Sequence, residues 1–546
     1  MSRSTASARP RNDPIAWHLL LIVCVSAGYE SLFVHHGIGW LFDEGWPLYA
    51  AMRLHAGGIL YRDVSFIFPP GHLLCAWVAA ALDPPGIILA RVFYAVFNVA
   101  LCVAMYLLAR RLMRAPYALL AVLLLAVAAP RSHLSHLLFG YRYLVFAILV
   151  LLAFARRLGL EAGDTRRAFF WMMAAGIGAG VAVCFRLTPA FAVSCAVTVG
   201  VLAHSADWRA WLRDWTAYGL GLALVLASAL IWFASGVGLE TLWREIVVRA
   251  VVMTERQSLP ILPLTLLPAS GGRGDVFRWF IALQYRAYGI LFAGYILGLS
   301  VRLVHARRAR IPFERTLLLS TAIWGGVYLL RSLGRSDDHH LMSELPPACL
   351  LLAHGLDQIA RRVGARADAS RRTKRVFATL TALAVLGVWG YAQRVDLFLT
   401  SRYRGEVPIA STGGAVRVTS RKTARRIDRV VEVIRRTTRV GDVILDLTGA
   451  PLFYPLTGRL GPGFLDVVSP GSFMSAAEER AFVERLADQP PAAVLWPRDD
   501  FDDMEQRSLS ASAPLVSAWV RRKYREHRVI DRYAVLLPRR PPVDPR

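Results

Sequence analysis

The chain has 546 residues, 55% of them hydrophobic, and its mean hydropathy of +0.41 exceeds that of ordinary soluble globular proteins. Its formal net charge of +25 would suggest nucleic-acid binding in a soluble protein. Most arginines, however, lie between long apolar runs, as the cytoplasmic loops of membrane proteins require. Composition therefore excludes a soluble globular protein and predicts an α-helical polytopic membrane protein.

Apolar segments recur along the first 398 residues, and we expect about 11 of them to be transmembrane helices. They fall at 15–36, 86–109, 116–130, 138–155, 168–186, 188–204, 216–235, 281–304, 316–333, 341–357 and 376–398. A further apolar run, Leu73–Leu82, is too short to cross a bilayer and is predicted to be an interfacial or re-entrant helix.

Basic residues predict the orientation of these helices. Clusters at 3–11, 110–114, 156–167, 209–213, 307–310 and 361–375 all fall on one side if the segments alternate. We therefore expect a multi-pass inner (plasma) membrane protein with a cytoplasmic N-terminus. A transmembrane catalytic domain would span 1–398, with large exoplasmic loops at 37–85 and 236–280. The tail, 399–546, would be exoplasmic or periplasmic.

The second loop and the tail have their own patterns. Leu239–Val248 has apolar residues at helical spacing, which predicts an amphipathic helix on the membrane. Pro260–Asp275 is rich in Pro and Gly and is either a mobile cover over a site or an inert connection. In the tail we predict strands at 443–447, 492–496 and 533–537, a helix at 476–486, and a segment 518–526 leading into the last strand. These elements indicate a small α/β domain without chemistry of its own.

An acidic pair, Asp43-Glu44, directly follows the first apolar segment. One interpretation is structural, with Asp43 capping a helix that starts near Gly45. The other is catalytic, because two carboxylates at a membrane face are costly unless they bind a cation or transfer protons. In that case one carboxylate is a general base towards an acceptor, and the other orients it.

Two later residues of the first loop are candidates for orienting the acceptor. Asp63 belongs to the turn Tyr61-Arg62-Asp63, which is either a polar turn with an internal ion pair or part of the site. His72 follows Pro69-Pro70 and is either a boundary residue or a neighbour of the acceptor.

A second constellation lies at the entry to the tenth apolar segment. It consists of Arg331, Arg335, Ser336, Asp337, Asp338, His339 and His340, followed by Glu344 and Pro346-Pro347. Arg335, His339 and His340 are suited to hold a phosphate or diphosphate headgroup. Asp337 and Asp338 also permit a divalent metal, although the spacing matches no specific metal motif. An ordinary solvated loop is the third interpretation. No cofactor is certain.

Isolated arginines occur at the expected exoplasmic helix ends. Arg142 and Arg186 are candidate ligands for a lipid phosphate, since an arginine inside an apolar segment usually has a partner. Alternatively, they pair with the acidic loop or extend to the interface.

The order of these motifs resembles the GT-C superfamily of polyprenyl-phosphate-sugar-dependent glycosyltransferases, in particular the protein O-mannosyltransferases and aminoarabinose transferases. The order of segments is similar over most of the chain, and the most specific similarity is in the first loop. The matching residues are Asp43-Glu44, Gly58–Val64, Phe68-Pro69-Pro70, Arg91, and Gly334–His340 before Leu345-Pro346-Pro347.

The resemblance implies that Asp43 is the catalytic base and that a sugar moves with inversion from polyprenyl phosphate to an exoplasmic acceptor, which is a cell-envelope glycan, a lipid or a protein. A basic cradle for the leaving phosphate then replaces a nucleotide-binding fold. Phe68 stands where some aminoarabinose transferases have a basic residue, which disfavours an aminoarabinose donor. The main alternative is a transporter or flippase for lipid-linked or anionic substrates, which would place its charged residues near mid-membrane. A structural or assembly protein is the third reading, and it leaves the acidic loop unexplained.

Overall fold

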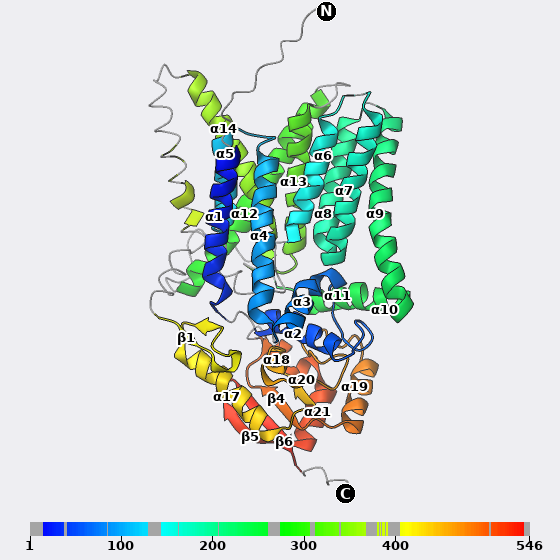
Figure 1. Ribbon diagram of the computed structural model, residues 1–546, viewed down its shortest axis with the longest axis vertical. Coiled ribbons are helices and arrows are strands. Elements are labelled where there is room, and N and C mark those ends of the chain that lie inside the picture. The colour runs from blue at the N-terminus through cyan, green and yellow to red at the C-terminus, as the bar shows by residue number, and fades with distance from the viewer. Residues whose placement is uncertain are drawn as a thin grey trace, which may run out of the picture.

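The fold was analysed in a computed structural model of the chain (Figure 1). The structure describes residues 15–37, 41–84, 86–128, 143–161, 163–205, 207–259, 273–305, 312–337, 340–366, 405–501 and 504–539, together with scattered helical residues between 379 and 390.

A bundle of long helices forms the upper part of the molecule in Figure 1. Its helices within the described residues are α1 (Ile15–Val34), α4 (Ile87–Ala109), α5 (Ala115–Ala126), α6 (Leu144–Leu158), α7 (Thr165–Phe185), α8 (Leu187–His204), α9 (Trp208–Val237), α12 (Arg273–His305), α13 (Phe313–Ser332) and α14 (Leu345–Arg366). Each coincides with a predicted segment, while the eleventh, 376–398, lies largely outside the described residues. Six described helices are long and apolar enough to cross a membrane: α1, α4, α7, α8, α9 and the Arg278–Arg302 part of α12. The total of 11 stays a prediction.

Helices α7 and α9 approach each other at the level of their backbones. A Cβ added to Gly176 would lie 2.9 Å from the backbone nitrogen of Leu222, and one added to Gly221 would lie 2.9 Å from that of Ile177. Small residues permit such close packing between helices in lipid, where burial of apolar surface provides little driving force. Further along the chain, α9 exposes apolar side chains, including Ile231 and Trp232, as expected of a lipid-facing helix.

A layer of short helices crosses the lower end of the bundle (Figure 1). From the first loop come α2 (Leu41–His55), the 3₁₀ turn η1 (Pro70–Leu73) and α3 (Leu74–Leu82). From the second loop come α10 (Leu239–Trp243), the π-helix η4 (Arg244–Arg249) and α11 (Ala250–Arg256). The helical conformation predicted for 73–82 and for 239–248 is thus confirmed, while their place at the membrane surface stays a prediction.

Two expectations for these loops need correction or fall outside the described residues. Helix α2 begins at Leu41, not near Gly45, so Asp43 and Glu44 lie within its first turn. The predicted cap at Asp43 is therefore wrong. Of the predicted cover Pro260–Asp275, residues 260–272 lie outside the described residues, and Arg273–Asp275 begin α12.

The C-terminal region is an α/β domain below this layer (Figure 1). It contains β1 (Val407–Pro408), η6 (Ala410–Thr412), β2 (Arg417–Val418), α17 (Arg421–Thr437), β3 (Ile444–Asp446), α18 (Phe453–Thr457), α19 (Ala476–Asp488), β4 (Ala493–Pro497), η8 (Glu505–Arg507), α20 (Leu509–Ser512), α21 (Pro514–Lys523), β5 (Tyr524–Ile530) and β6 (Tyr533–Pro538). The predicted strands and the helix at 476–486 are confirmed. Segment 518–526 is instead the end of α21 followed by β5.

The main sheet has the order β3-β4-β6-β5, with β3 and β4 parallel and the other neighbours antiparallel. Its two faces belong to different cores because successive strand residues point to opposite sides. Leu445, Val494 and Leu536 join one core with residues of α19 and α21. Ile444 and Val535 join another, which includes α17 and also residues of α2, α3 and α4. The sheet and the first loop therefore share one hydrophobic core.

Candidate active site

The first turn of α2 is tied to α4 by a buried ion pair. Arg91 donates from Nε to Glu44 Oε1 at 2.7 Å and from Nη2 to Glu44 Oε2 at 2.6 Å, and both side chains are fully buried. Arg91 also donates to the carbonyls of Val34 at 3.0 Å and Gly37 at 2.7 Å. One guanidinium thus joins the end of α1, the start of α2 and α4, and compensates the buried Glu44 charge.

This arrangement fixes the surroundings of one of the two predicted acidic residues, Glu44. Glu44 has both oxygens bonded to Arg91, away from solvent. Asp43 precedes it in the same helical turn. The structure therefore brings together Glu44 and Arg91, which lie 47 residues apart in sequence.

An aromatic cluster continues from Arg91 along α4. Tyr94, one turn further, hydrogen-bonds the hydroxyl of Tyr143 at the start of α6, and it donates to the carbonyl of His72 at 3.3 Å. The buried His72 ring stacks on Phe68, with ring centroids 4.7 Å apart. These contacts place the predicted His72 among aromatic rings, next to the end of the first loop.

Arg186 lies at the break between α7 and α8, where its extended backbone interrupts the helix. Its guanidinium lies 5.2 Å from the centroid of the Phe68 ring, a cation–π contact. The first loop lies close to this break. A Cβ added to Gly71 would be only 2.7 Å from the Cys184 carbonyl oxygen. The predicted Arg186 is therefore beside the first loop. The predicted Arg142 lies outside the described residues.

A second arginine, Arg331, approaches the same region from the end of α13. Tyr328, one turn earlier on α13, lies near enough to interact electrostatically with both Arg186 and Arg331. Tyr328 is therefore within electrostatic range of two half-buried arginines from different parts of the bundle. Such a pair is suited to bind a phosphate group.

The 335–340 segment forms a closed set of contacts. Asp337 accepts from Arg335 Nε at 3.0 Å, from His340 Nδ1 at 2.7 Å and from the His340 backbone nitrogen at 2.8 Å. Arg335 also donates to the carbonyl of Gln257 at 2.7 Å, which joins this segment to the second loop. Asp338 and His339 lie outside the described residues.

These contacts limit how far the 335–340 segment can bind a phosphate or a metal ion. Burial lowers the pKa of His340 to about 4, so its ring is neutral at pH 7 and supplies no positive charge to a phosphate. No group of three or more His, Cys, Asp or Glu side chains that could hold a metal occurs within the described part of the chain. Asp337 itself is engaged by Arg335 and His340.

Asp63 lies in the polar turn that was one of its two interpretations. Its carboxylate pairs with Arg62 at 2.9 Å and accepts from the Ile59 backbone nitrogen at 2.9 Å. The hydrogen bond from Arg62 lowers the pKa of Asp63. The Asp63 carbonyl accepts from the backbone nitrogen of Phe464 at 2.9 Å, so the turn also contacts the C-terminal domain.

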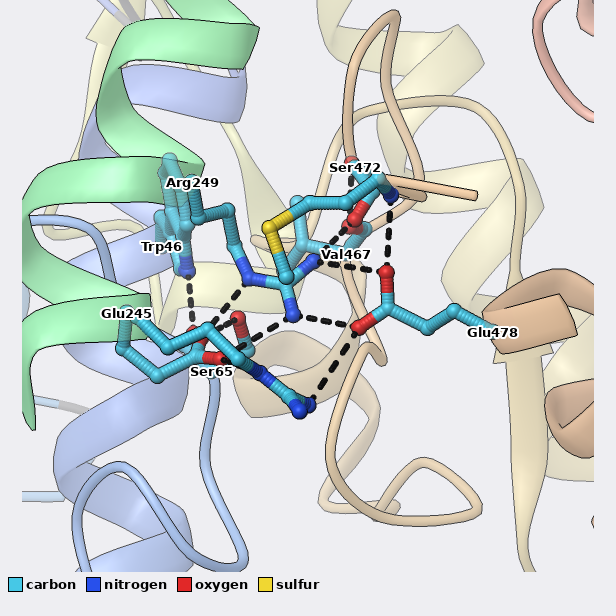
Figure 2. Close-up of polar contacts among 9 residues, drawn as sticks. Trp46, Ser65, Glu245, Arg249, Val467, Ser472 and Glu478 are labelled. Atoms are coloured by element: carbon cyan, nitrogen blue, oxygen red, sulfur yellow. Dashed lines mark hydrogen bonds and ion pairs between the residues drawn. The ribbon is translucent and has the colours of Figure 1, made fainter. Parts of the chain in front are cut away.

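Figure 2 shows a junction that was not predicted, where both loops meet the C-terminal domain. Arg249 of η4 is buried and pairs with Glu245 at 2.8 Å and with Glu478 of α19 at 2.5 Å. Ser65 of the first loop donates to Glu245 at 3.1 Å, and its carbonyl accepts from Trp46 Nε1 at 3.2 Å. The four-residue spacing of Glu245 and Arg249 was the available signal, but their burial depends on a domain more than 200 residues away.

Comparison with known proteins adds evidence from the fold. No protein-family model matches the sequence, and no curated protein matches it. ArnT from Cupriavidus metallidurans, solved with undecaprenyl phosphate bound, aligns with a TM-score of 0.56 at 15% identity, over 96% of this chain and 98% of that chain. The oligosaccharyltransferase AglB from Archaeoglobus fulgidus, solved with an inhibitory peptide and a dolichol-phosphate, aligns with a TM-score of 0.55 at 13% identity, over 88% of this chain and 69% of that chain. Over most of its length the chain therefore shares the fold of these two proteins.

Proposed function

We propose that this protein is a membrane glycosyltransferase that moves a sugar from a polyprenyl-phosphate donor to an acceptor outside the inner membrane, with inversion at the anomeric carbon. The observation that carries the proposal is that Arg186 lies beside the first loop of a GT-C fold, 5.2 Å from the Phe68 ring, while Tyr328 interacts electrostatically with both Arg186 and Arg331. Both similar proteins were solved with a lipid phosphate, and the arginine guanidinium group is well suited to bind a phosphate.

In this proposal Asp43 is the general base. Its carboxylate takes the proton of an acceptor hydroxyl, and the acceptor oxygen forms a bond to the anomeric carbon opposite the phosphate. The bond between that carbon and the phosphate oxygen breaks, and its electron pair leaves with the polyprenyl phosphate. Arg186 and Arg331 stabilise the charge that develops on this leaving group.

Other candidates have supporting roles in the proposal. Glu44 is a positioning residue, because Arg91 engages both of its oxygens. His72 and Phe68 form the aromatic surface against which Arg186 rests. Asp63 shapes the turn that meets the C-terminal domain, and Arg335, Asp337 and His340 hold the second loop to α13. Arg142, Asp338 and His339 stay candidates from sequence.

The orientation proposed for the protein follows from the basic clusters. Both loops and the C-terminal domain lie at one end of the bundle, and α4 and α6 end at the other, with their arginines (Figure 1). We place the arginine-rich end in the cytoplasm and the C-terminal domain in the periplasm. The acceptor is then a cell-envelope glycan, a lipid or a protein.

The test is a transfer assay. Purified protein would be incubated with a panel of polyprenyl-phosphate sugars and candidate acceptors, while release of polyprenyl phosphate and glycosylated product are followed. We expect release with at least one donor, and we expect Asp43→Asn to abolish it while membrane insertion is retained. Asp63→Asn is the matched control and should keep most activity.

Two results would contradict the proposal. Full transfer by Asp43→Asn would remove Asp43 as the base. Movement of a lipid-linked sugar across proteoliposome membranes, without any glycosylated product, would identify a flippase instead.

A further inference from the structure

The C-terminal domain touches the first turn of α2 directly. A Cβ added to Gly45, the residue after the acidic pair, would lie 2.7 Å from Leu452 Cα and 2.7 Å from the carbonyl carbon of Pro451. Real Cβ atoms essentially never come within 3.0 Å of such neighbours, and here the neighbours are backbone atoms. The backbones of α2 and of the loop before α18 are therefore in contact beside Asp43 and Glu44.

A second contact holds the middle of α2. The Tyr49 hydroxyl donates to the carboxylate of Asp466 and accepts from the Gly461 backbone nitrogen at 3.0 Å. The Tyr49 ring stacks on Tyr454, with centroids 4.2 Å apart. Arg53, one turn later, lies 3.8 Å from the same Asp466 carboxylate. Tyr49, Tyr454 and Asp466 are all buried, so these groups are screened from water.

A third contact reaches α2 through the second loop. Arg249 forms ion pairs with Glu478 of the domain and with Glu245 (Figure 2). Glu245 accepts a hydrogen bond from Ser65, and the Ser65 carbonyl accepts one from Trp46 of α2. The π-helical turn that carries Glu245 and Arg249 is a rare conformation that is frequent at functional sites.

We propose that the C-terminal domain is a positioning element of the active site, which sets the place of Asp43 by fixing α2 through Gly45–Leu452 and Tyr49–Asp466. This inference rests on the proposed function. A helix as short as α2 is marginal without tertiary contacts. Much of its packing comes from the domain, since Trp46, Leu48 and Tyr49 share one core with Leu452 and Tyr454.

A displaced α2 should affect the kinetics differently from a defect in donor binding. A general base displaced by about 1 Å can lower the rate about 100-fold, because proton transfer requires a defined geometry. The donor phosphate would be held by Arg186 and Arg331, at the α7–α8 break and on α13, whereas the atoms nearest to an added Cβ at Gly45 belong to Pro451 and Leu452. Moving α2 should therefore lower kcat and leave the KM for the donor almost unchanged.

The experiment compares Gly45→Ala and Asp466→Asn in the full-length protein with two controls. Gly28→Ala lies in α1, where an added Cβ has no heavy atom within 4 Å. Asp531→Asn removes a surface ion pair of the same domain, with Lys422 and Arg426. Donor kinetics and hydrogen–deuterium exchange of the backbone amides of residues 41–55 are measured for all four.

We expect Gly45→Ala and Asp466→Asn to lower kcat about tenfold or more, to change the donor KM less than about threefold, and to speed exchange in α2. The controls should match the wild type. Unchanged kcat and exchange in both variants, or a raised KM at unchanged kcat, would overturn the inference. If Gly45→Ala does not fold, Asp466→Asn decides alone. If the wild type transfers no sugar, the proposed function fails, and the exchange data still decide whether the domain holds α2.

Discussion

Glu44 and Arg91 face each other through two hydrogen bonds of 2.6 and 2.7 Å, with both side chains fully buried. Arg91 further bonds the carbonyls of Val34 and Gly37. The residue beside the proposed base is therefore one half of a buried ion pair, which links three segments of the chain.

Removing one partner of this ion pair should destabilise the protein strongly. We expect Arg91→Ala to cost about 3–5 kcal/mol, because it leaves the Glu44 charge buried and uncompensated. Thermal unfolding of the purified protein in detergent measures the loss. The double variant Glu44→Gln/Arg91→Met removes both charges and should recover much of the stability. Equal stability of the single and double variants would contradict a charge effect.

The two arginines at the break of α7–α8 and at the end of α13 should contribute to donor binding. We expect Arg186→Ala and Arg331→Ala each to weaken inhibition by polyprenyl phosphate about 10- to 100-fold, as for loss of a hydrogen bond to a charged group. His340→Gln should change it little, because the low pKa of His340 leaves the ring neutral at pH 7. Arg439→Ala, on the surface of the domain, is the control. A larger effect of His340→Gln than of Arg186→Ala would refute this assignment.

Backbone contact between α7 and α9 leads to a prediction about the bundle. Gly176→Ala forces a Cβ against the backbone of Tyr218 and Leu222, so it should destabilise the bundle by about 1–3 kcal/mol. Gly219→Ala on α9 has no heavy atom within 4 Å of the added Cβ and serves as the control. Yield and unfolding temperature in detergent measure both. The same loss in the control would point to glycine flexibility rather than packing.

Asp446 makes stability depend on pH. Burial raises its pKa to about 7, although Thr448 donates two hydrogen bonds to Oδ1, and Oδ2 has no hydrogen-bond partner among the described residues. Because the folded pKa exceeds the unfolded one, the protonated form favours folding, and this contribution is lost as pH rises through 7.

Asp446→Asn should therefore stabilise the protein at pH 8 relative to the wild type, with an upper limit of about 4 kcal/mol, and should have little effect at pH 4. Unfolding temperatures across this range measure the difference. Asp428→Asn is the comparison. Asp428 lies on α17, and its carboxylate accepts from the backbone nitrogens of Ala410 and Ser411 in η6. A gain independent of pH would exclude titration of Asp446 as the cause.

Periodicity and length predicted much of the fold. Long apolar runs fold as helices in lipid because only helices satisfy every backbone group there, so ten predicted segments coincide with helices of the described residues. The strands at 444–446, 493–497 and 533–538 were equally visible as short apolar runs. Helix α17 was missed, although its amphipathic pattern was present in the sequence, and α2 was predicted to begin too late.

The site was less predictable because burial and pairing depend on distant residues. The sequence pointed to Asp43-Glu44 and Arg91, but it did not show that Glu44 pairs with Arg91 across 47 residues. His340 appeared suited to hold phosphate, whereas burial beside Asp337 keeps it neutral. The junction of Arg249 with Glu478 joins segments 229 residues apart, which no local pattern reveals.

The shared core of the first loop and the C-terminal domain has a consequence for biosynthesis. Trp46 and Tyr49, near the start of the chain, pack in the same cluster as Tyr533 and Val535, near its end. That cluster cannot close until the ribosome has made almost the whole polypeptide. A nascent or truncated chain can therefore insert its helices and still lack the part of this core that packs against α2.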